Sequence, residues 1–210
     1  MPCGYLYKKV NIKLYHMTNV KKYTTEQLLD RVKSLKDFND FPTGFWLLGV
    51  RSNEDAFNEM DDKFYLMQGE KSVFVFGGTT NAGKTGLLGF EGYNKDGCAV
   101  LQADNIVYDY YEQGYHKGKV WALRQAKGFP YMRDNDKDKK AEDKGGVIHT
   151  NIIYANFHPA SYVAGSMTER RFIDGWSLAC QVTSVRADFD KVMRLLGKQK
   201  KVTYALLNEF

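Results

Sequence analysis

The chain has 210 residues, which fits one domain or one compact domain preceded by an N-terminal extension. Apolar residues make up 43% of it and charged residues 26%, which supports a packed core and excludes wholesale disorder. The net charge of +5 is too small to mark a nucleic-acid-binding surface by itself. No apolar run approaches the ~18 residues that a membrane-spanning helix needs. We therefore expect neither a nucleic-acid nor a membrane partner.

Residues 1–40 are predicted to form an N-terminal extension with one helix. Residues 5–16 resemble a strand or an arm. Thr24 and Gln27 have the spacing of a capping box, and apolar residues follow at helical intervals, which predicts a helix over 24–37. The first eleven residues lack the basic and apolar regions of a secretory signal, which argues against Sec secretion.

Residues 41–210 are predicted to form the main domain, an α+β fold of mainly antiparallel or mixed β-sheet with a few flanking helices. The glycines between 77 and 97 argue against a helix in that stretch. Asp188 is placed to cap a helix that ends at Gly197. The expected strands are 45–51, 64–67, 72–76, 104–111, 118–125, 147–158 and 202–207.

The string from Gly78 to Thr85 satisfies the P-loop pattern GxxxxGK[ST] and follows a predicted strand. A P-loop needs a helix beginning at the Lys-Thr pair, because the helix amides hold the phosphates. Glycines at 86, 89 and 92 disfavour that helix. We therefore interpret the string as a glycine-rich connection between strands. A P-loop nucleoside triphosphatase is the alternative, and it predicts nucleotide binding that is sensitive to Lys84→Ala.

Three cysteines, Cys3, Cys98 and Cys180, are scattered and never form a CxxC pair, which argues against a disulfide framework and a zinc ribbon. Cys180 follows a tight Gly-Trp-Ser approach. A thiol nucleophile needs a nearby imidazole to take its proton and backbone amides to stabilise an oxyanion. Residues around Cys180 and the histidines upstream are the strongest candidates for such a site.

Five short motifs resemble a pattern shared by uncharacterised phage and bacterial proteins. They are His116-Lys117-Gly118, Ala122-Leu123-Arg124-Gln125, Arg133-Asp134-Asn135-Asp136, Asn156-Phe157-His158 and Trp176-Ser177-Leu178-Ala179-Cys180-Gln181-Val182. More broadly, the stretch ending at Cys180 resembles the signature of the L,D-transpeptidase (YkuD-type) family. That signature is a histidine ending a strand, a variable loop, and Ser-x-Gly-Cys-x-Arg entering another strand.

The resemblance implies an L,D-transpeptidase-like β-sandwich or barrel over residues 41–210 and a catalytic set. Cys180 is the implied nucleophile, His158 the favoured base, and Ser177 and Ala179 complete the catalytic motif. The implied substrate-binding residues are His116, Arg124, His149 and Trp176. His149 is also the alternative base.

The implied activity is attack of Cys180 on an amide of a peptidoglycan peptide, giving an acyl-enzyme without a cofactor. Peptidoglycan is then the partner. The phage-like relatives favour a wall-degrading enzyme over one that forms crosslinks. The location is then the cytoplasm of the producing cell or the phage virion.

Two positions depart from the family signature. Ala179 stands where the family has glycine. Gln181 follows Cys180 in the stretch where the family has its arginine. Loss of the arginine removes a bidentate carboxylate clamp, for which Arg124 or Arg133 could substitute.

The alternative is a non-catalytic structural protein that keeps the fold, for example a virion component with other virion proteins as partners. Cys180 would then be a small buried apolar residue. The two hypotheses differ in the thiol, since catalysis predicts a depressed pKa and a core cysteine stays inert until unfolding. Trp176 is in either case expected in the core or in a cleft wall.

Asp134, Asp136 and Asp138 alternate as the first ligands of a calcium loop do, with Glu142 further along. The glycine that such a loop needs is replaced by Lys139, and further lysines oppose a cation. A solvated charged loop with local Asx turns is the preferred interpretation.

Overall fold

The computed structural model describes residues 18–54, 56–141 and 146–210, so the arm expected at 5–16 lies outside the described residues. The helices are α1 (Thr25–Lys33), α2 (Lys84–Gly89) and α3 (Arg186–Leu196), with a 3-10 turn, η1, at Phe90–Gly92. The strands are β1 (Phe45–Arg51), β2 (Asp62–Gln68), β3 (Lys71–Thr79), β4 (Cys98–Leu101), β5 (Asn105–His116), β6 (Val120–Gln125), β7 (Tyr131–Asp134), β8 (Phe157–Pro159), β9 (Gln181–Thr183) and β10 (Lys201–Asn208).

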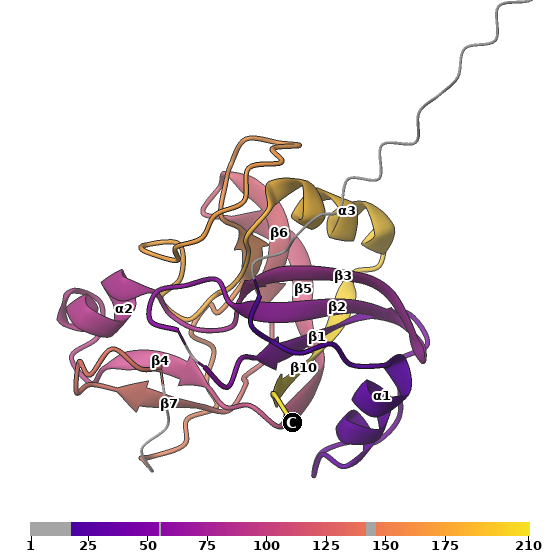
Figure 1. The fold of residues 1–210 in the computed structure, drawn as a ribbon, viewed down its shortest axis with the longest axis horizontal. Helices are drawn as coiled ribbons and strands as arrows, with labels where there is room; N and C mark the ends of the chain where they lie inside the picture. The colour runs from indigo at the N-terminus through magenta and orange to yellow at the C-terminus, as the bar shows by residue number, and fades with distance from the viewer. Residues whose placement is uncertain (1–17, 55, 142–145) are drawn as a thin grey trace, which may run out of the picture.

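Eight of the strands in this described part form a closed barrel in the order β1-β10-β5-β6-β8-β9-β3-β2 (Figure 1). The neighbours β1–β10 and β8–β9 are parallel, and the other pairs are antiparallel. β4 and β7 form a separate antiparallel pair. The predicted α+β class with a mixed, mainly antiparallel sheet is confirmed.

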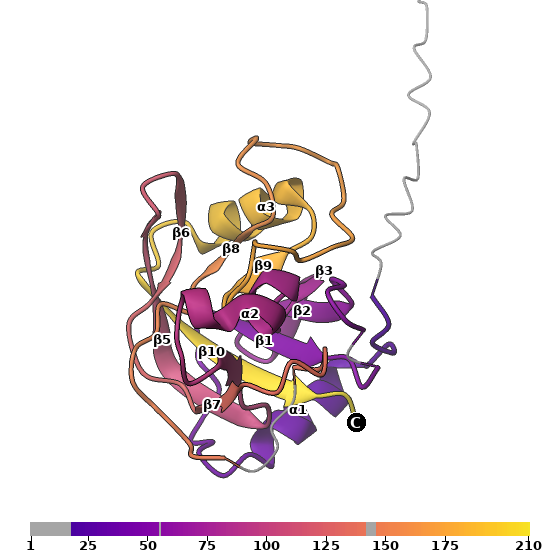
Figure 2. The same ribbon diagram turned by 90° about the vertical axis from the view of Figure 1, so that its left-hand side faces the viewer.

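The barrel wall has two apolar faces because successive strand residues point to opposite sides. In β2, Phe64 and Leu66 belong to one buried cluster, whereas Tyr65 and Met67 belong to another. The first cluster includes residues of α3, and the second includes Leu28, Leu29 and Val32 of α1. Figures 1 and 2 show the two helices on opposite sides of the barrel.

The helix predicted over 24–37 is confirmed as α1, which is shorter at its C-terminal end. The Thr24 hydroxyl accepts the Gln27 amide at 3.2 Å, and the Gln27 side chain accepts the Thr24 amide at 2.8 Å, so both halves of the capping box form. Because α1 shares a cluster with β1, β2 and β10, the part of the extension from residue 18 packs directly on the barrel.

The expectation of no helix among the glycines after residue 77 is wrong, because α2 begins at Lys84. Tertiary contacts stabilise this six-residue helix: the Gly83 amide donates to the Ser177 carbonyl at 3.0 Å and the Lys84 amide to Asn58 Oδ1 at 2.8 Å. The Thr80 amide is likewise bonded to the Asp62 carboxylate, at 2.6 Å. These amides are occupied by protein acceptors, so the segment lacks the open amides of a P-loop despite its strand–loop–helix order.

The strand predicted over 147–158 is also wrong, because only Phe157–Pro159 joins the barrel. Upstream, the Gln125 side-chain oxygen accepts the amides of Ile153 at 3.0 Å and Ala155 at 2.8 Å. A side chain thus takes the place of a partner strand.

Near the C-terminus, α3 begins at Arg186, and its N-cap residue, Val185, makes no side-chain hydrogen bond. Asp188, the predicted cap, therefore lies inside the first turn of the helix. The predicted end of the helix at Gly197 is confirmed.

Barrel closure requires a glycine at position 78. β3 and β9 are joined by two residue pairs, Gly78 with Thr183 and Thr79 with Val182. A Cβ atom at Gly78 would lie 2.1 Å from the Val182 carbonyl oxygen and 2.9 Å from the Phe64 ring. The two strands could not then approach to hydrogen-bonding distance.

We predict that Gly78→Ala lowers the free energy of unfolding by about 2–3 kcal/mol, because the extra methyl overpacks this contact. Urea denaturation measures the change. Gly89→Ala is the matched control, since a Cβ there meets nothing within 4 Å, and it should leave stability nearly unchanged. Equal stability of the two variants would contradict the described closure.

Candidate functional site

A cavity of about 710 Å³ opens beside the β5–β6 hairpin, between the segment 152–156 and the segment 175–180. It is lined by one thiol, one imidazole, three cationic side chains and several aromatic rings. The chemically active lining residues are His116, Lys117, Arg124, Arg133, Trp176 and Cys180. The structure therefore brings most of the sequence-predicted site residues to one cavity.

Cys180 is held immediately before β9 by backbone contacts. The Ser177 hydroxyl donates to the Cys180 carbonyl at 2.8 Å, and the Gln181 amide donates to the Asn156 carbonyl at 2.8 Å. The thiol itself donates to the Tyr154 carbonyl at 3.6 Å. Ser177 is fully buried, so it fixes the turn and does not reach the cavity.

The Cys180 thiol is protonated at neutral pH. Burial raises its pKa to about 11, and the Asn156 amide and the Lys117 ammonium oppose that rise. The sequence-based expectation of a depressed pKa is therefore not met. Any nucleophilic role requires a base that removes the proton during attack.

His158 lies on the same face of the β8–β9 pair as Cys180. The parallel register pairs Phe157 with Gln181 and His158 with Val182, and paired residues of parallel strands point to the same side. Continued one position back, this register sets Cys180 beside Asn156. The Cα atoms of His158 and Cys180 are then roughly 8 Å apart by standard strand spacings. His158 itself is not among the residues that line the cavity.

The rings of His116 and His158 stack, with centroids 4.1 Å apart and planes inclined by 23°. His158 is 1% exposed and His116 is 3% exposed. His158 Nδ1 lies 3.1 Å from the Pro159 carbonyl oxygen. Because that oxygen only accepts, Nδ1 carries the hydrogen and Nε2 carries the lone pair.

Both imidazoles are neutral at pH 7. Burial and, less strongly, the charge of His116 lower the pKa of His158 to about 3, although the Pro159 and Trp176 carbonyls favour protonation. Burial also lowers the pKa of His116 to about 4, with Lys117 and Arg124 acting in the same direction. Among the described residues, neither ring has a hydrogen-bond partner at Nε2.

Comparisons of the chain with protein-family models, with curated proteins and with solved structures find no match. In the described ranges, no helix has the length and apolar character needed to cross a membrane.

The remaining predicted site residues have different surroundings. Ala179, Arg124 and Trp176 line the cavity, and the Trp176 ring packs edge-on against Tyr162 at 5.2 Å. His149 is not among the lining residues. It forms an isolated β-bridge with Tyr131, and the rings of His149 and Tyr131 stack with their centroids 5.2 Å apart.

The sequence interpretation missed the roles of Asn156 and Gln125, although both stand inside the quoted motifs. Asn156 Oδ1 accepts the Gln125 amide at 2.8 Å, and its Nδ2 lies 3.0 Å from His116 Nδ1. Asn156 precedes His158 by two residues, so strand alternation alone could have placed it on the His158 face.

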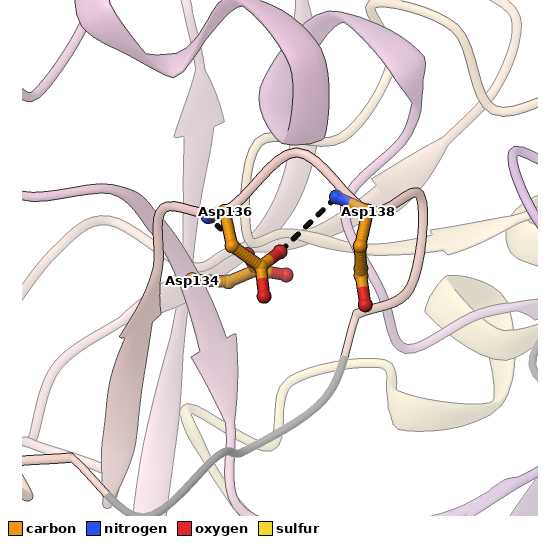
Figure 3. A group of neighbouring side chains, drawn as sticks. All are labelled: Asp134, Asp136 and Asp138. Atoms are coloured by element: carbon orange, nitrogen blue, oxygen red, sulfur yellow. Dashed lines mark hydrogen bonds between the residues drawn. The ribbon is translucent and has the colours of Figure 1, made fainter.

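Asp134, Asp136 and Asp138 bring carboxylate oxygens within 4.8 Å of one another (Figure 3). Each carboxylate accepts a backbone amide two residues on: Asp136 at 3.4 Å, Asp138 at 3.1 Å and Lys140 at 2.9 Å. These are the predicted Asx turns. Glu142, the further ligand considered for calcium, lies outside the described residues.

We predict slow alkylation of Cys180 by iodoacetamide in the native protein at pH 7. A thiol whose pKa rises from 9.0 to about 11 has about 100-fold less thiolate. The rate should increase about tenfold per pH unit toward pH 11. Mass spectrometry of the Cys180 peptide measures it, with denatured protein as the control. A rate that levels off near pH 7 would instead indicate a thiolate–imidazolium pair.

We also predict that acid destabilises the fold through the two buried histidines. Their pKa values are lower in the folded state, so their contribution to stability is complete above pH 6.5. It is lost as the pH falls toward 4 for His116 and toward 3 for His158. His116→Gln should reduce the loss by about 1.4 kcal/mol per pH unit between pH 6 and 4.5. Urea denaturation across that range measures the difference. Parallel curves for both proteins would contradict a buried neutral His116.

Proposed function

We propose that this chain is a cysteine-dependent acyl-transfer enzyme, with Cys180 as the nucleophile that attacks an amide of a peptidoglycan peptide. The observation that carries the proposal is the placement of Cys180 in a large cavity, on the same strand face as His158. Support also comes from the resemblance of residues 176–182 to the L,D-transpeptidase motif. The closed barrel is compatible with that family's expected β-rich fold.

His158 is the proposed base because its tautomer suits the task. As Sγ forms a bond to the amide carbon, the thiol proton moves to His158 Nε2 and the carbonyl electron pair moves onto oxygen. The Pro159 and Trp176 carbonyls favour the imidazolium that forms. Collapse of the intermediate expels the amine, which takes the proton from His158 and leaves a thioester on Cys180.

The backbone amides of Ala179 and Cys180 are the proposed donors to the oxyanion. Water then attacks the thioester carbon, loses a proton to His158 and releases the acid and the thiol. An amine acceptor in place of water would give a crosslink. We favour hydrolysis, as in a phage-type wall-degrading enzyme.

The charge around the cavity favours a substrate with carboxylates. Lys117, Arg124 and Arg133 line it, whereas no Asp or Glu is among the described residues that do so. Peptidoglycan stem peptides carry free carboxylates, so this lining suits them. The family motif has an arginine after its cysteine, which this chain lacks after Cys180. Arg124 and Arg133 are its proposed replacements.

A non-catalytic structural role is the second candidate, and two observations favour it. Burial raises the pKa of Cys180 to about 11, as expected of a core cysteine and not of an activated nucleophile. In the described structure Cys180 donates to Tyr154, and His158 Nδ1 is bonded to Pro159, so no hydrogen bond joins the thiol to the imidazole. A protein that kept the fold without turnover would have the same ground state.

We predict that Cys180→Ala abolishes release of new amines from purified peptidoglycan while leaving the melting temperature within a few degrees of the wild type. Loss of the nucleophile removes the acyl-enzyme route. Cys98→Ser is the matched control, since Cys98 is a buried cysteine outside the cavity lining, and it should retain turnover. An active Cys180→Ala protein, or an inactive wild type, would contradict the enzyme proposal and favour the structural one.

A further inference from the structure

The stacked rings of His116 and His158 are held in opposite tautomers. The backbone N–H of Gln125 can only donate, so the Asn156 side-chain atom that lies 2.8 Å from it is the carbonyl oxygen. The other Asn156 atom is then the NH2 group, which donates to His116 Nδ1 at 3.0 Å. A neutral His116 therefore carries its hydrogen on Nε2. His158 has the reverse arrangement, since its Nδ1 donates to Pro159.

His116 Nε2–H is a donor without an acceptor in the described structure. The residue is 3% exposed and lines the cavity that holds Cys180. A buried donor left without a partner costs about 1–3 kcal/mol. Nε2 itself is buried, so an acceptor oxygen of a ligand in the cavity would satisfy it once binding opens the His116 side of the cavity.

The neutral state of the His116 ring determines which chemical role its Nε2–H can take. Burial, with Lys117 and Arg124 acting in the same direction, disfavours a proton on the second nitrogen, so the ring stays an imidazole at pH 7. A neutral imidazole can polarise a carbonyl oxygen by a hydrogen bond and does not hand over its proton readily. Because Nδ1 is already occupied by Asn156, His116 is unsuited to be the base.

We propose that His116 is a further catalytic residue, which donates its Nε2 hydrogen to the carbonyl oxygen of the scissile amide as negative charge develops there. The inference rests on the proposed acyl transfer by Cys180. The two adjacent rings then have different roles: His158 takes the proton from the thiol, and His116 adds to the proposed backbone amides of Ala179 and Cys180 in stabilising the oxyanion. Gln125 and Asn156 are positioning residues, because they act through the tautomer of His116.

Two reagents separate these roles. p-Nitrophenyl acetate acylates Cys180 through an oxyanion, with p-nitrophenolate leaving and a thioester forming. Methyl methanethiosulfonate reacts at sulfur, so that a disulfide forms, methanesulfinate leaves with the electron pair and no oxyanion develops. Both reagents need the base, because each reacts with the thiol as it loses its proton, whereas only the first needs the oxygen donor.

We expect His116→Leu to slow acylation by p-nitrophenyl acetate about 100-fold, the effect of losing one oxyanion donor, and to change the thiosulfonate rate less than about threefold. His116→Gln offers an amide N–H near the position of Nε2 and should restore most of the acylation rate. Both rates are measured by mass spectrometry of the Cys180 peptide.

Equal losses with both reagents would overturn the proposal, because His116 would then act on the thiol. Unchanged acylation in His116→Leu would overturn it as well. A wild-type Cys180 that forms the disulfide but never the thioester would remove the acyl-transfer function, and this inference with it. If His116→Leu does not fold, the nitrogen NMR spectrum of wild-type histidine side chains decides. An Nε2–H tautomer at His116 supports the donor role, and an Nδ1–H tautomer excludes it.

Discussion

The parallel pairing of β8 and β9 is the constraint on which the site depends. Each strand has three residues, and the two are separated along the chain by the segment 160–180. Their register places Phe157 and Gln181 toward the barrel interior, where the Gln181 side chain accepts the Tyr204 hydroxyl at 2.6 Å. The opposite face then receives His158 from one strand and, beside Asn156, Cys180 from the approach to the other. The same strand pairing thus contributes both to the barrel wall and to the candidate site.

Local sequence patterns predicted the elements that carry their own signals. The capping box at Thr24, the strand at 45–51 and the helix end at Gly197 rest on neighbouring residues, and each is confirmed. The segment 147–158 has the apolar content of a strand, yet most of it follows a path set by Gln125, a residue more than twenty positions upstream. No local pattern reveals an acceptor so distant in the chain.

The candidate site was predictable in composition but not in electrostatics. The sequence motifs alone indicate Cys180, His158, His116, Arg124 and Trp176. They could not show that His149 bonds to the edge of β7, or that burial would raise the pKa of Cys180 and lower those of two histidines. Those shifts depend on how deeply each group lies, which the packed barrel and the segment 152–156 determine together.

The bond from Gln125 has a consequence for motion. One side-chain oxygen accepts the amides of both Ile153 and Ala155, so a single rotation of that side chain frees two backbone groups at once. Ile152 and Tyr154 beside them are exposed at 45% and 66%, whereas Ala155 is fully buried in the core cluster and its carbonyl accepts the Tyr110 hydroxyl at 3.3 Å. Motion of this wall of the cavity is therefore restricted at residues 153 and 155, while the intervening side chains face solvent. One barrel side chain thus sets the shape of the cavity wall.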